Sequence, residues 1–365
     1  MNTIRTATTI TTLGLVAMMM AGCASGVSTA SADTDADAGT DSAPSVSEVR
    51  LGYFANVTHA PALVGLEEGL FEDALGDVEV TTSVFNAGPA AIEALTAGAI
   101  DATYIGPNPS INTFIQSGGE SAHIIAGAAT GGAALVVADG IDSPEDLEGK
   151  TLATPQLGNT QDVALRVWLD DEGYTTDTTG GGDVHITPTE NAQTLTLFQQ
   201  GDLDGAWLPE PWVSRLIVDA GAHVLQDEAE LWPDGEFPTT VLLVRAEFLE
   251  EHPDVVADLL EGHLAAVNWI AEHPDEAPGV INAALEAETG KALADEIITR
   301  ALEHVTFSVD PHADTFETLV ENGLKAGTQK DGSIDGLFDL RLLNGLLADA
   351  GQDEVSAAGL GEDTP

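Results

Sequence analysis

The feature that most constrains this chain is a pattern of apolar residues, glycine and aspartate that occurs twice, 103 residues apart. In each copy a glycine follows residues with helical apolar spacing. An aspartate and a short apolar run come next, and a turn with two prolines ends the copy. Seven matched positions in the same order favour two related lobes over chance. They are Ile92, Leu95, Gly98, Ile100, Asp101, Tyr104 and Ile105 in the first copy, and Leu195, Phe198, Gly201, Leu203, Asp204, Trp207 and Leu208 in the second.

The first copy predicts a helix that starts at Gly88 and ends at Gly98, followed by a strand over 99–105. Pro89 suits the first helical turn, because its missing N–H needs no partner there. Gly98 suits a left-handed cap at the helix end. The turn Gly106-Pro-Asn-Pro109 closes the strand. A helix N-terminus and a strand C-terminus therefore fall close together, as they do in the ligand crevices of open α/β sheets.

From Glu48 onward, strand-like segments alternate with helix-like segments, which predicts an α/β fold with mostly parallel sheets. Two crossovers, near residues 138–143 and 234–240, would join two lobes. The expected strands cover 49–54, 78–85, 99–105, 123–126, 133–137, 151–154, 184–188 and 239–244. The expected domains are lobe one over 48–138 plus 239–350, lobe two over 139–238, and an acidic, frayed tail over 351–365.

The N-terminus has the pattern of an export signal over 1–22, with Arg5 ahead of the apolar run Leu13–Met20. This run is too short for a membrane span of about 20 residues. Small residues directly before the lone Cys23 resemble the bacterial lipobox, which implies cleavage before Cys23 and diacylglycerol attachment to its thiol. The alternative is an ordinary secretory signal with an incidental cysteine. Residues 23–47 predict a flexible acidic tether that holds the folded part at the outer face of the cell membrane.

The charge is strongly negative, with 61 acidic against 11 basic residues and a formal net charge of −50. Nucleic-acid binding is excluded, because it needs clusters of Lys and Arg. The acidic residues are spread along the chain, which predicts a solvated acidic surface. Such a surface suits a high-salt habitat, where the screening length falls to about 3 Å at 1 M. A single cysteine excludes an intramolecular disulfide.

Catalytic signatures are missing from the sequence: there is no nucleophile elbow, zinc signature or nucleotide-binding loop. The nine histidines show neither i,i+4 spacing nor pairing with cysteine, so each is interpreted as structural. The glycine-rich segment Gly180-Gly-Gly-Asp183 lacks the Lys-Ser/Thr that a phosphate loop requires. We therefore expect no enzyme activity, no cofactor and no metal.

Polar loops at the carboxyl ends of predicted strands remain as candidates, because α/β sheets bind ligands there. Two of these loops begin helices, whose free N–H groups and positive dipole end suit a small oxyanion. Neutral amide and hydroxyl side chains add donors, although capping explains Asn86 and Asn159 equally well. Trp207 and Trp212 suit either a pocket wall or the core, and Glu210 is either exposed or a partner for a ligand cation. The predicted ligand-binding residues are Phe54, Asn56, Asn86, Ala87, Gly88, Gly106, Asn108, Asn159, Thr160, Gln161, Trp207, Glu210 and Trp212.

Six motifs carry a resemblance that covers the chain from about residue 48 to at least residue 270. They are Phe85-Asn-Ala-Gly-Pro89, Glu93-Ala-Leu95, Gly98-x-Ile-Asp101, Tyr104-Ile-Gly-Pro-Asn-Pro109, Asp146-Leu-Glu-Gly-Lys150, and Gly201-x-Leu-Asp204 with Trp207. As a set they resemble the nitrate/sulfonate/taurine substrate-binding proteins of ABC importers. Singly, none of them is specific.

This resemblance implies a two-lobed periplasmic-binding-protein fold of type II, which closes on a ligand and delivers it to a permease and its ATPase. A sulfonate, taurine or nitrate type of anion leads among the ligands, and a monomer is expected. Glu210-Pro211 departs from the residues usual in sulfonate binders, which leaves a neutral, zwitterionic or pyrimidine ligand open. A sensor or adhesion lipoprotein is a further hypothesis. A cytosolic thiamine-pyrimidine synthase is disfavoured by the export signal and the lack of clustered histidines.

Overall fold

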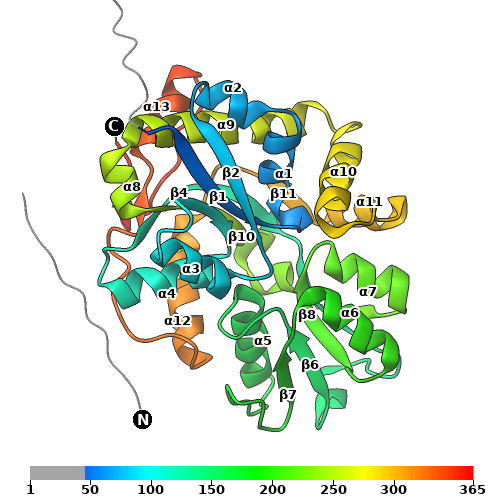
Figure 1. The fold of residues 1–365 in the computed structure, drawn as a ribbon. Coiled ribbons are helices and arrows are strands. Elements are labelled where there is room, and N and C mark those ends of the chain that lie inside the picture. The colour runs from blue at the N-terminus through cyan, green and yellow to red at the C-terminus, as the bar shows by residue number, and fades with distance from the viewer. Residues whose placement is uncertain (1–45, 365) are drawn as a thin grey trace, which may run out of the picture. The chain divides into compact units, whose positions relative to one another are not determined.

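A computed structural model describes residues 46–364 (Figure 1). The predicted export signal 1–22, the lipidation site Cys23 and all but the last two positions of the tether 23–47 lie outside the described residues. Within the described range the strands form two sheets, with helices packed around each. The predicted α/β class is confirmed.

The first sheet, in lobe one, has eight strands within residues 46–364 and the order β13-β12-β4-β10-β3-β1-β2, with β11 paired to β4. β1 pairs in parallel with β2 and β3, whereas β10 runs antiparallel between β3 and β4. The strands are β1 Glu48–Phe54, β2 Glu79–Phe85, β3 Ala102–Ile105, β4 Ala122–Gly131, β10 Pro238–Arg245, β11 Val305–Phe307, β12 Phe338–Asp339 and β13 Gly361–Glu362.

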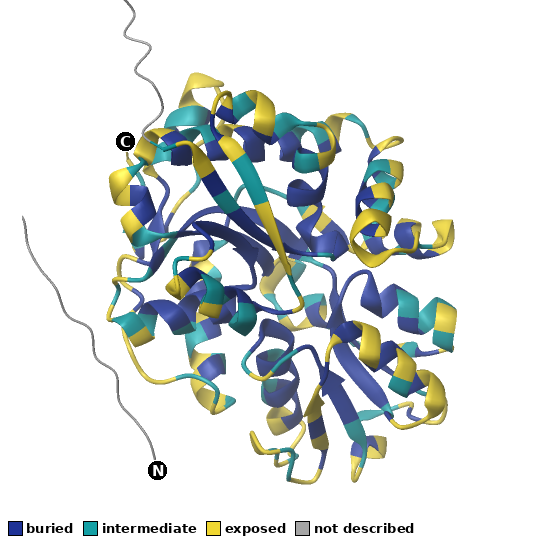
Figure 2. Ribbon diagram, viewed as in Figure 1, coloured by how far each residue is buried: buried dark blue, intermediate teal, exposed yellow. Residues whose placement is uncertain are grey.

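The second sheet, in lobe two, has five strands in the described part of the chain, in the order β7-β6-β8-β5-β9. β6 pairs in parallel with β7 and β8, and β5 runs antiparallel to β8 and β9. The strands are β5 Ala133–Val137, β6 Thr151–Thr154, β7 His185–Pro188, β8 Gly205–Pro209 and β9 His223–Asp227. Its central strands β5 and β8 are buried along their whole length (Figure 2).

Helices cover both sheets (Figure 1). In lobe two they are α5 Thr160–Asp171, α6 Asn191–Gln200 and α7 Trp212–Ala220. In lobe one they are α1 Ala60–Glu67, α2 Leu70–Leu75, α3 Gly88–Thr96, α4 Pro107–Ser117, α8 Ala246–Glu251, α9 Pro253–Glu272, α10 Ala277–Thr289, α11 Asp295–Glu303, α12 Phe316–Lys325 and α13 Arg341–Asp349. Short 3₁₀ helices are η1 Val57–His59, η2 Pro144–Leu147, η3 Glu228–Leu231, η4 Pro233–Gly235 and η5 Ala313–Thr315.

The first crossover lies earlier than the sequence predicted. The segment 133–137, expected in lobe one, is β5 of the second sheet, so the chain changes lobes at Gly131 and Gly132 and not at 138–143. Both glycines have positive φ, 73° and 71°, a backbone conformation that glycine adopts without steric cost. The return to lobe one at β10, beginning with Pro238, lies within the predicted crossover 234–240.

The C-terminal segment also differs from its prediction as a frayed tail over 351–365. Gly361 and Glu362 pair in parallel with β12, and the side chains of Ala357 and Leu360 are buried. The segment therefore packs on the edge of the first sheet. None of the described helices is both long and apolar enough to cross a membrane.

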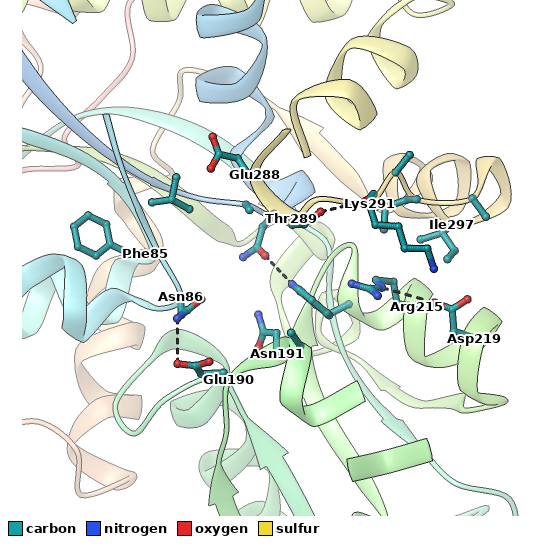
Figure 3. A pocket seen from close by; sticks show the side chains of 18 residues that line it. Phe85, Asn86, Glu190, Asn191, Arg215, Asp219, Glu288, Thr289, Lys291 and Ile297 are labelled. Atoms are coloured by element: carbon teal, nitrogen blue, oxygen red, sulfur yellow. Dashed lines mark hydrogen bonds and ion pairs between the residues drawn. The ribbon is translucent and has the colours of Figure 1, made fainter. Parts of the chain in front are cut away.

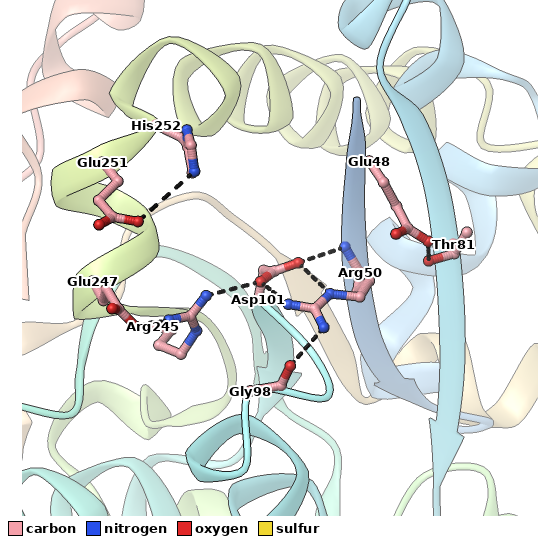
Figure 4. Close-up of polar contacts among 9 residues, drawn as sticks. All are labelled: Glu48, Arg50, Thr81, Gly98, Asp101, Arg245, Glu247, Glu251 and His252. Carbon is pink, nitrogen blue, oxygen red and sulfur yellow. Dashed lines mark hydrogen bonds and ion pairs between the residues drawn. The ribbon is translucent and has the colours of Figure 1, made fainter. Parts of the chain in front are cut away.

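The repeat in the sequence is a repeat in the structure. Gly98 and Gly201 both follow a helix with positive φ, 67° and 78°, and a buried strand begins within a few residues of each. Asp101 and Asp204 then bind the neighbouring parallel strand through its backbone N–H, at Arg50 and Thr151 (Figure 4 shows the first of these). The prediction of two lobes with a shared local design is confirmed.

Candidate ligand-binding site

A small cavity lies where the carboxyl ends of strands from both sheets meet, at the place that the α/β rule predicts. Its volume is about 20 Å³, which is room for one water molecule. A ligand of several non-hydrogen atoms therefore requires a small separation of the lobes. We call this cavity the inner pocket. Its lining residues are Phe54, Asn56, Thr58, His59, Asn86, Gly106, Pro155, Asn159, Gln161, Asn191, Pro209 and Thr239.

The lining of the inner pocket is polar but contains no Lys, Arg, Asp or Glu. Two long helices of lobe two begin at it: α5, with Asn159 as its N-cap and Gln161 in its first turn, and α6, which starts at Asn191. The first N–H groups of a helix have no partner inside the helix, and they carry the positive end of its dipole. The inner pocket therefore offers neutral donors and a positive local potential without a formal charge.

His59 adds a neutral donor that the sequence interpretation missed, because all histidines were assigned structural roles. It follows β1 in η1, and its ring is buried. Burial lowers the pKa of the His59 imidazole to about 3, so the ring is neutral at physiological pH. Its Nδ1 accepts a hydrogen bond from the backbone N–H of Phe54 at 3.3 Å, which leaves the ring proton on Nε2. The position of His59, in the segment that follows β1, is the signal that could have identified it.

Three hydrogen bonds join the two lobes beside the inner pocket. The backbone N–H of Gly88, at the start of α3, donates to Asn159 Oδ1 at 3.0 Å. Trp212 Nε1 donates to Asn56 Oδ1 at 2.8 Å, and Asn86 Nδ2 donates to Glu190 Oε1 at 3.1 Å. Each bond links a residue of lobe one to a residue of lobe two. The structure is therefore a closed form, held by several of the predicted site residues.

A larger cavity of about 670 Å³ continues from the inner pocket, with which it shares Asn56, Asn86 and Asn191 (Figure 3). We call it the outer pocket. Trp212 and Arg215 of α7 line it from lobe two. Glu288 and Thr289 at the end of α10, and residues 291–294 of the loop before α11, line it from lobe one together with Val84 and Phe85.

The outer pocket carries two cations and three carboxylates, in Arg215, Lys291, Glu190, Asp219 and Glu288. The Arg215 guanidinium lies 4.5 Å from the centre of the Trp212 ring, a cation–π distance. Burial lowers the pKa of Arg215, although the group stays charged. The sequence interpretation singled out neither Arg215 nor Lys291.

The thirteen predicted site residues divide into three groups. Phe54, Asn56, Asn86, Gly106, Asn159 and Gln161 line the inner pocket, and Trp212 lines the outer pocket. Ala87, Gly88 and Thr160 lie directly beside them: Ala87 caps α3, Gly88 bonds Asn159, and the Thr160 hydroxyl packs against Gly106. Asn108, Trp207 and Glu210 lie elsewhere.

Trp207 lies in the core of lobe two, fully buried against Trp168, and its Nε1 donates to Glu228 Oε2 at 2.7 Å. Of the two roles considered for Trp207, pocket wall or core, its position supports the core. Asn108 is buried in α4, with Nδ2 at 3.4 Å from the carbonyl of Leu319.

Glu210 is also buried and faces away from both pockets. Its carboxylate accepts hydrogen bonds from the backbone and hydroxyl of Ser214, at 3.0 and 2.9 Å, and from Arg300 of lobe one at 3.1 Å. Burial raises the pKa of Glu210 to about 7, and the bonds from Ser214 and Arg300 oppose that rise. Its cation partner is thus a residue of the chain itself. No group of three or more His, Cys, Asp or Glu in the described part of the chain could hold a metal ion.

The closed two-lobed arrangement defines the class of this protein: it has the fold of the periplasmic binding proteins. The alkanesulfonate-binding protein SsuA from Xanthomonas axonopodis pv. citri, bound to MOPS, matches with a TM-score of 0.66 and 19% identity, over 78% of this chain and 95% of that one. The periplasmic nitrate-binding protein NrtA from Synechocystis PCC 6803 matches with a TM-score of 0.66 and 16% identity, over 77% and 82%.

The chain belongs to the NMT1-like family, whose family model matches residues 42–285. Its relatives include a putative binding protein of Brucella abortus, 27% identical over 69% of this chain and 79% of that one. The taurine-binding periplasmic protein of Escherichia coli K12 is 28% identical over 59% and 64%. The putative aliphatic sulfonates-binding protein of Bacillus subtilis 168 is 29% identical over 63% and 67%. These relatives are named as binding proteins and not as enzymes.

Proposed function

We propose that this protein is an extracytoplasmic solute-binding lipoprotein of an ABC importer. It captures a small anion of the aliphatic sulfonate, taurine or nitrate type between its two lobes and delivers it to the permease. The names of relatives support this range of ligands, since they include a taurine-binding protein and a putative aliphatic sulfonates-binding protein. A structural neighbour is a nitrate-binding protein.

The observation that carries the proposal is the convergence of α5 and α6 on the inner pocket. Asn159 and Gln161 stand at the start of α5, and Asn191 stands at the start of α6. Backbone N–H groups at helix N-termini bind small oxyanions without a side-chain cation. Such donors act at contact distance, where the attraction of aligned dipoles outweighs the diffuse repulsion from a chain of net charge −50.

One observation favours the alternative, a neutral, zwitterionic or pyrimidine ligand. Asn191 Oδ1 is buried and has no hydrogen-bond partner within the described residues. An unpaired amide oxygen at the pocket costs about 1–3 kcal/mol, and an N–H or O–H group of a ligand would relieve that cost. An anion without a proton to donate offers no such group.

The lipid anchor is the second part of the proposal, and it rests on Cys23 with the small residues before it. Attachment at Cys23 would leave residues 24–47 as a tether between the membrane and lobe one. Mass spectrometry of the membrane fraction would detect a diacylglyceryl Cys23, and Cys23→Ala should release the protein from the membrane.

A calorimetric panel at fixed ionic strength tests the ligand class. It compares taurine, alkanesulfonates, nitrate, bicarbonate and a thiamine-precursor pyrimidine. We expect saturable binding of at least one anion, and we expect Gln161→Ala to weaken it. Binding of the pyrimidine alone would establish the alternative in place of the anion.

A further inference from the structure

The outer pocket contains a lysine, Lys291, that has no carboxylate partner within residues 46–364. Within residues 46–364, every Lys and Arg except Lys291 and Lys330 lies within 4.0 Å of a carboxylate oxygen. Acidic residues outnumber basic ones 61 to 11, so an unpaired cation is exceptional here. Lys330 lines none of the cavities described, whereas Lys291 lines the outer pocket.

Arg215 stands in the same pocket with unused hydrogen-bonding capacity. Its nearest carboxylate oxygen, Asp219 Oδ2, lies 3.7 Å from Nε, beyond hydrogen-bond distance. Nε is buried and has no hydrogen-bond partner among the described residues. The side chain is held over Trp212 at 4.5 Å, so the guanidinium is fixed in position before a ligand arrives. A fixed guanidinium with free donors suits a carboxylate or sulfonate.

Two of the three carboxylates of the outer pocket are engaged elsewhere, and the third, Asp219, lies beside Arg215. Glu190 accepts a hydrogen bond from Asn86 Nδ2 at 3.1 Å, and Glu288 accepts one from the Tyr53 hydroxyl at 2.8 Å. Figure 3 shows Arg215 and Lys291 toward one end of the outer pocket, and Asn86 with Glu190 toward the other. With Asp219 beside Arg215, this basic end holds two cations and one carboxylate, so its local charge is still opposite in sign to that of the protein as a whole.

Apolar groups also line the outer pocket. Ala55, Ala192, Leu293 and Ile297 are among the lining residues of the outer pocket, and Trp212 stands at the junction through its bond to Asn56. A ligand that reaches from the inner pocket to Arg215 and Lys291 could therefore contact apolar as well as charged lining residues.

We propose that the outer pocket is a second subsite, which binds an anionic group at the far end of the ligand through Arg215 and Lys291. The substrate class is then a short organic acid with two polar ends: a small oxyanion in the inner pocket and a carboxylate or sulfonate in the outer pocket, joined by a few methylene groups. This proposal depends on the proposed function only for the oxyanion that is bound in the inner pocket.

A series of three ligands with three carbon atoms each tests the second subsite. Each carries a sulfonate at one end, and the other end is a carboxylate in 3-sulfopropanoate, a methyl group in propane-1-sulfonate and an ammonium group in 3-aminopropane-1-sulfonate. Calorimetry at fixed ionic strength gives the three dissociation constants. We expect 3-sulfopropanoate to bind about fivefold or more tighter than propane-1-sulfonate, because charge-assisted hydrogen bonds to Arg215 are stronger than neutral ones. The global charge of −50 favours the opposite order.

Three variants assign the effect to residues. Lys291→Gln and Arg215→Gln should each reduce the ratio of the two dissociation constants, and the double variant should bring it close to one. Lys330→Gln is the matched control, because it removes the same charge from the other unpaired lysine outside the pocket and should leave the ratio unchanged. A ratio that falls equally in the Lys330 variant would mean that net charge, and not the subsite, sets the preference.

The outcomes separate this proposal from the proposed function. Equal binding of all three ligands, or tightest binding of the ammonium compound, would overturn the second subsite and leave the sulfonate-binding function standing. A carboxylate preference that persists in the double variant would also overturn it. If none of the three ligands binds while nitrate does, the second subsite is wrong and the anion function survives. If no anion binds, both proposals are wrong.

Discussion

Asp101 and Asp204, 103 residues apart, make the same hydrogen bond in the two sheets: each carboxylate accepts a hydrogen bond from a backbone N–H of the neighbouring parallel strand. The distances are 3.0 Å from Arg50 N and 2.8 Å from Thr151 N. The backbone N–H of each aspartate also donates to the carbonyl of the same partner residue, Arg50 at 2.8 Å and Thr151 at 2.9 Å. The two lobes therefore repeat a hydrogen-bonding pattern and not only an order of elements.

The two aspartates differ in burial, which predicts unequal costs for the same substitution. Asp101 is 2% exposed and pairs with Arg50 and Arg245, whereas Asp204 is 35% exposed and pairs with Lys150 at 3.3 Å (Figure 4). We expect Asp101→Asn to lower the free energy of unfolding by about 2–3 kcal/mol, since Arg50 loses its carboxylate partner and Arg245 keeps only Glu247. Asp204→Asn should cost less than about 1 kcal/mol. Urea unfolding of both variants measures the difference, and equal costs would contradict it.

The two tryptophans of the second repeat should respond differently to the same change. Trp212→Phe removes the hydrogen bond to Asn56 across the lobes, so we expect ligand affinity to fall about three- to tenfold with little loss of stability. Trp207→Phe leaves buried Glu228 without its indole donor. It should lower stability by about 1–3 kcal/mol and leave affinity unchanged. Calorimetry measures the ligand affinity of both variants, and thermal unfolding measures their stability.

Closure should depend on Asn159, whose Oδ1 accepts the N–H of Gly88 from the other lobe. We expect Asn159→Ala to weaken ligand binding about fivefold, which corresponds to the loss of one hydrogen bond of about 1 kcal/mol. Small-angle scattering should show that the variant populates the open form more. Asn112→Ala is the control, because within residues 46–364 the side chain of Asn112 bonds only Gln116 of its own helix. Equal loss of affinity in both variants would argue against a closing role.

A buried carboxylate makes stability depend on pH. Burial raises the pKa of Glu228 to about 7, against the lowering effect of its bond from Trp207. Between about pH 4.5 and pH 7 the folded protein therefore keeps a proton on Glu228 that the unfolded chain has released. The contribution of Glu228 to the free energy of unfolding is complete below about pH 4.5 and is lost as the pH rises through 7.

Glu228→Gln keeps the acceptor for Trp207 and removes this loss. We expect the variant to gain about 2 kcal/mol over the unsubstituted protein at pH 8 and nothing at pH 4. Glu210→Gln is the comparison, because Glu210 has a cation partner in Arg300 at 3.1 Å, which the substitution leaves unpaired. Its gain at pH 8 should be smaller. Urea unfolding across this pH range checks both, and a flat difference for Glu228→Gln would contradict the assignment.

Salt should stabilise the folded chain, because the net charge of −50 repels itself. The screening length falls from about 10 Å at 0.1 M to about 3 Å at 1 M salt. We expect the melting temperature to rise by several degrees between 0.1 M and 2 M NaCl. Potassium chloride should act alike, and equal melting temperatures at both salt concentrations would count against a high-salt habitat.

The sequence alone determined the features that depend on neighbouring residues. Gly98 and Gly201 end helices because glycine adopts positive φ at no cost, and the aspartates three residues later mark the start of a strand in both lobes. Strand ends could be found from turn residues, so six of the predicted site residues do line the inner pocket, among them Asn56 and Asn159.

The tertiary structure decided what depends on residues far apart. A run such as Ala133–Val137 is apolar on both faces, so its composition fits either sheet, and only strand pairing assigned it to lobe two. For the same reason the sequence could not distinguish the two tryptophans. Trp207, in a strand buried on both sides, lies in the core, whereas Trp212, at the start of a helix, bonds a residue of the other lobe. Lys291 lies 76 residues from Arg215 in the sequence, and only closure of the lobes brings both to one cavity. Local chemistry fixes where strands and helices end, but the surfaces that meet across a cleft follow from the packing of the whole chain.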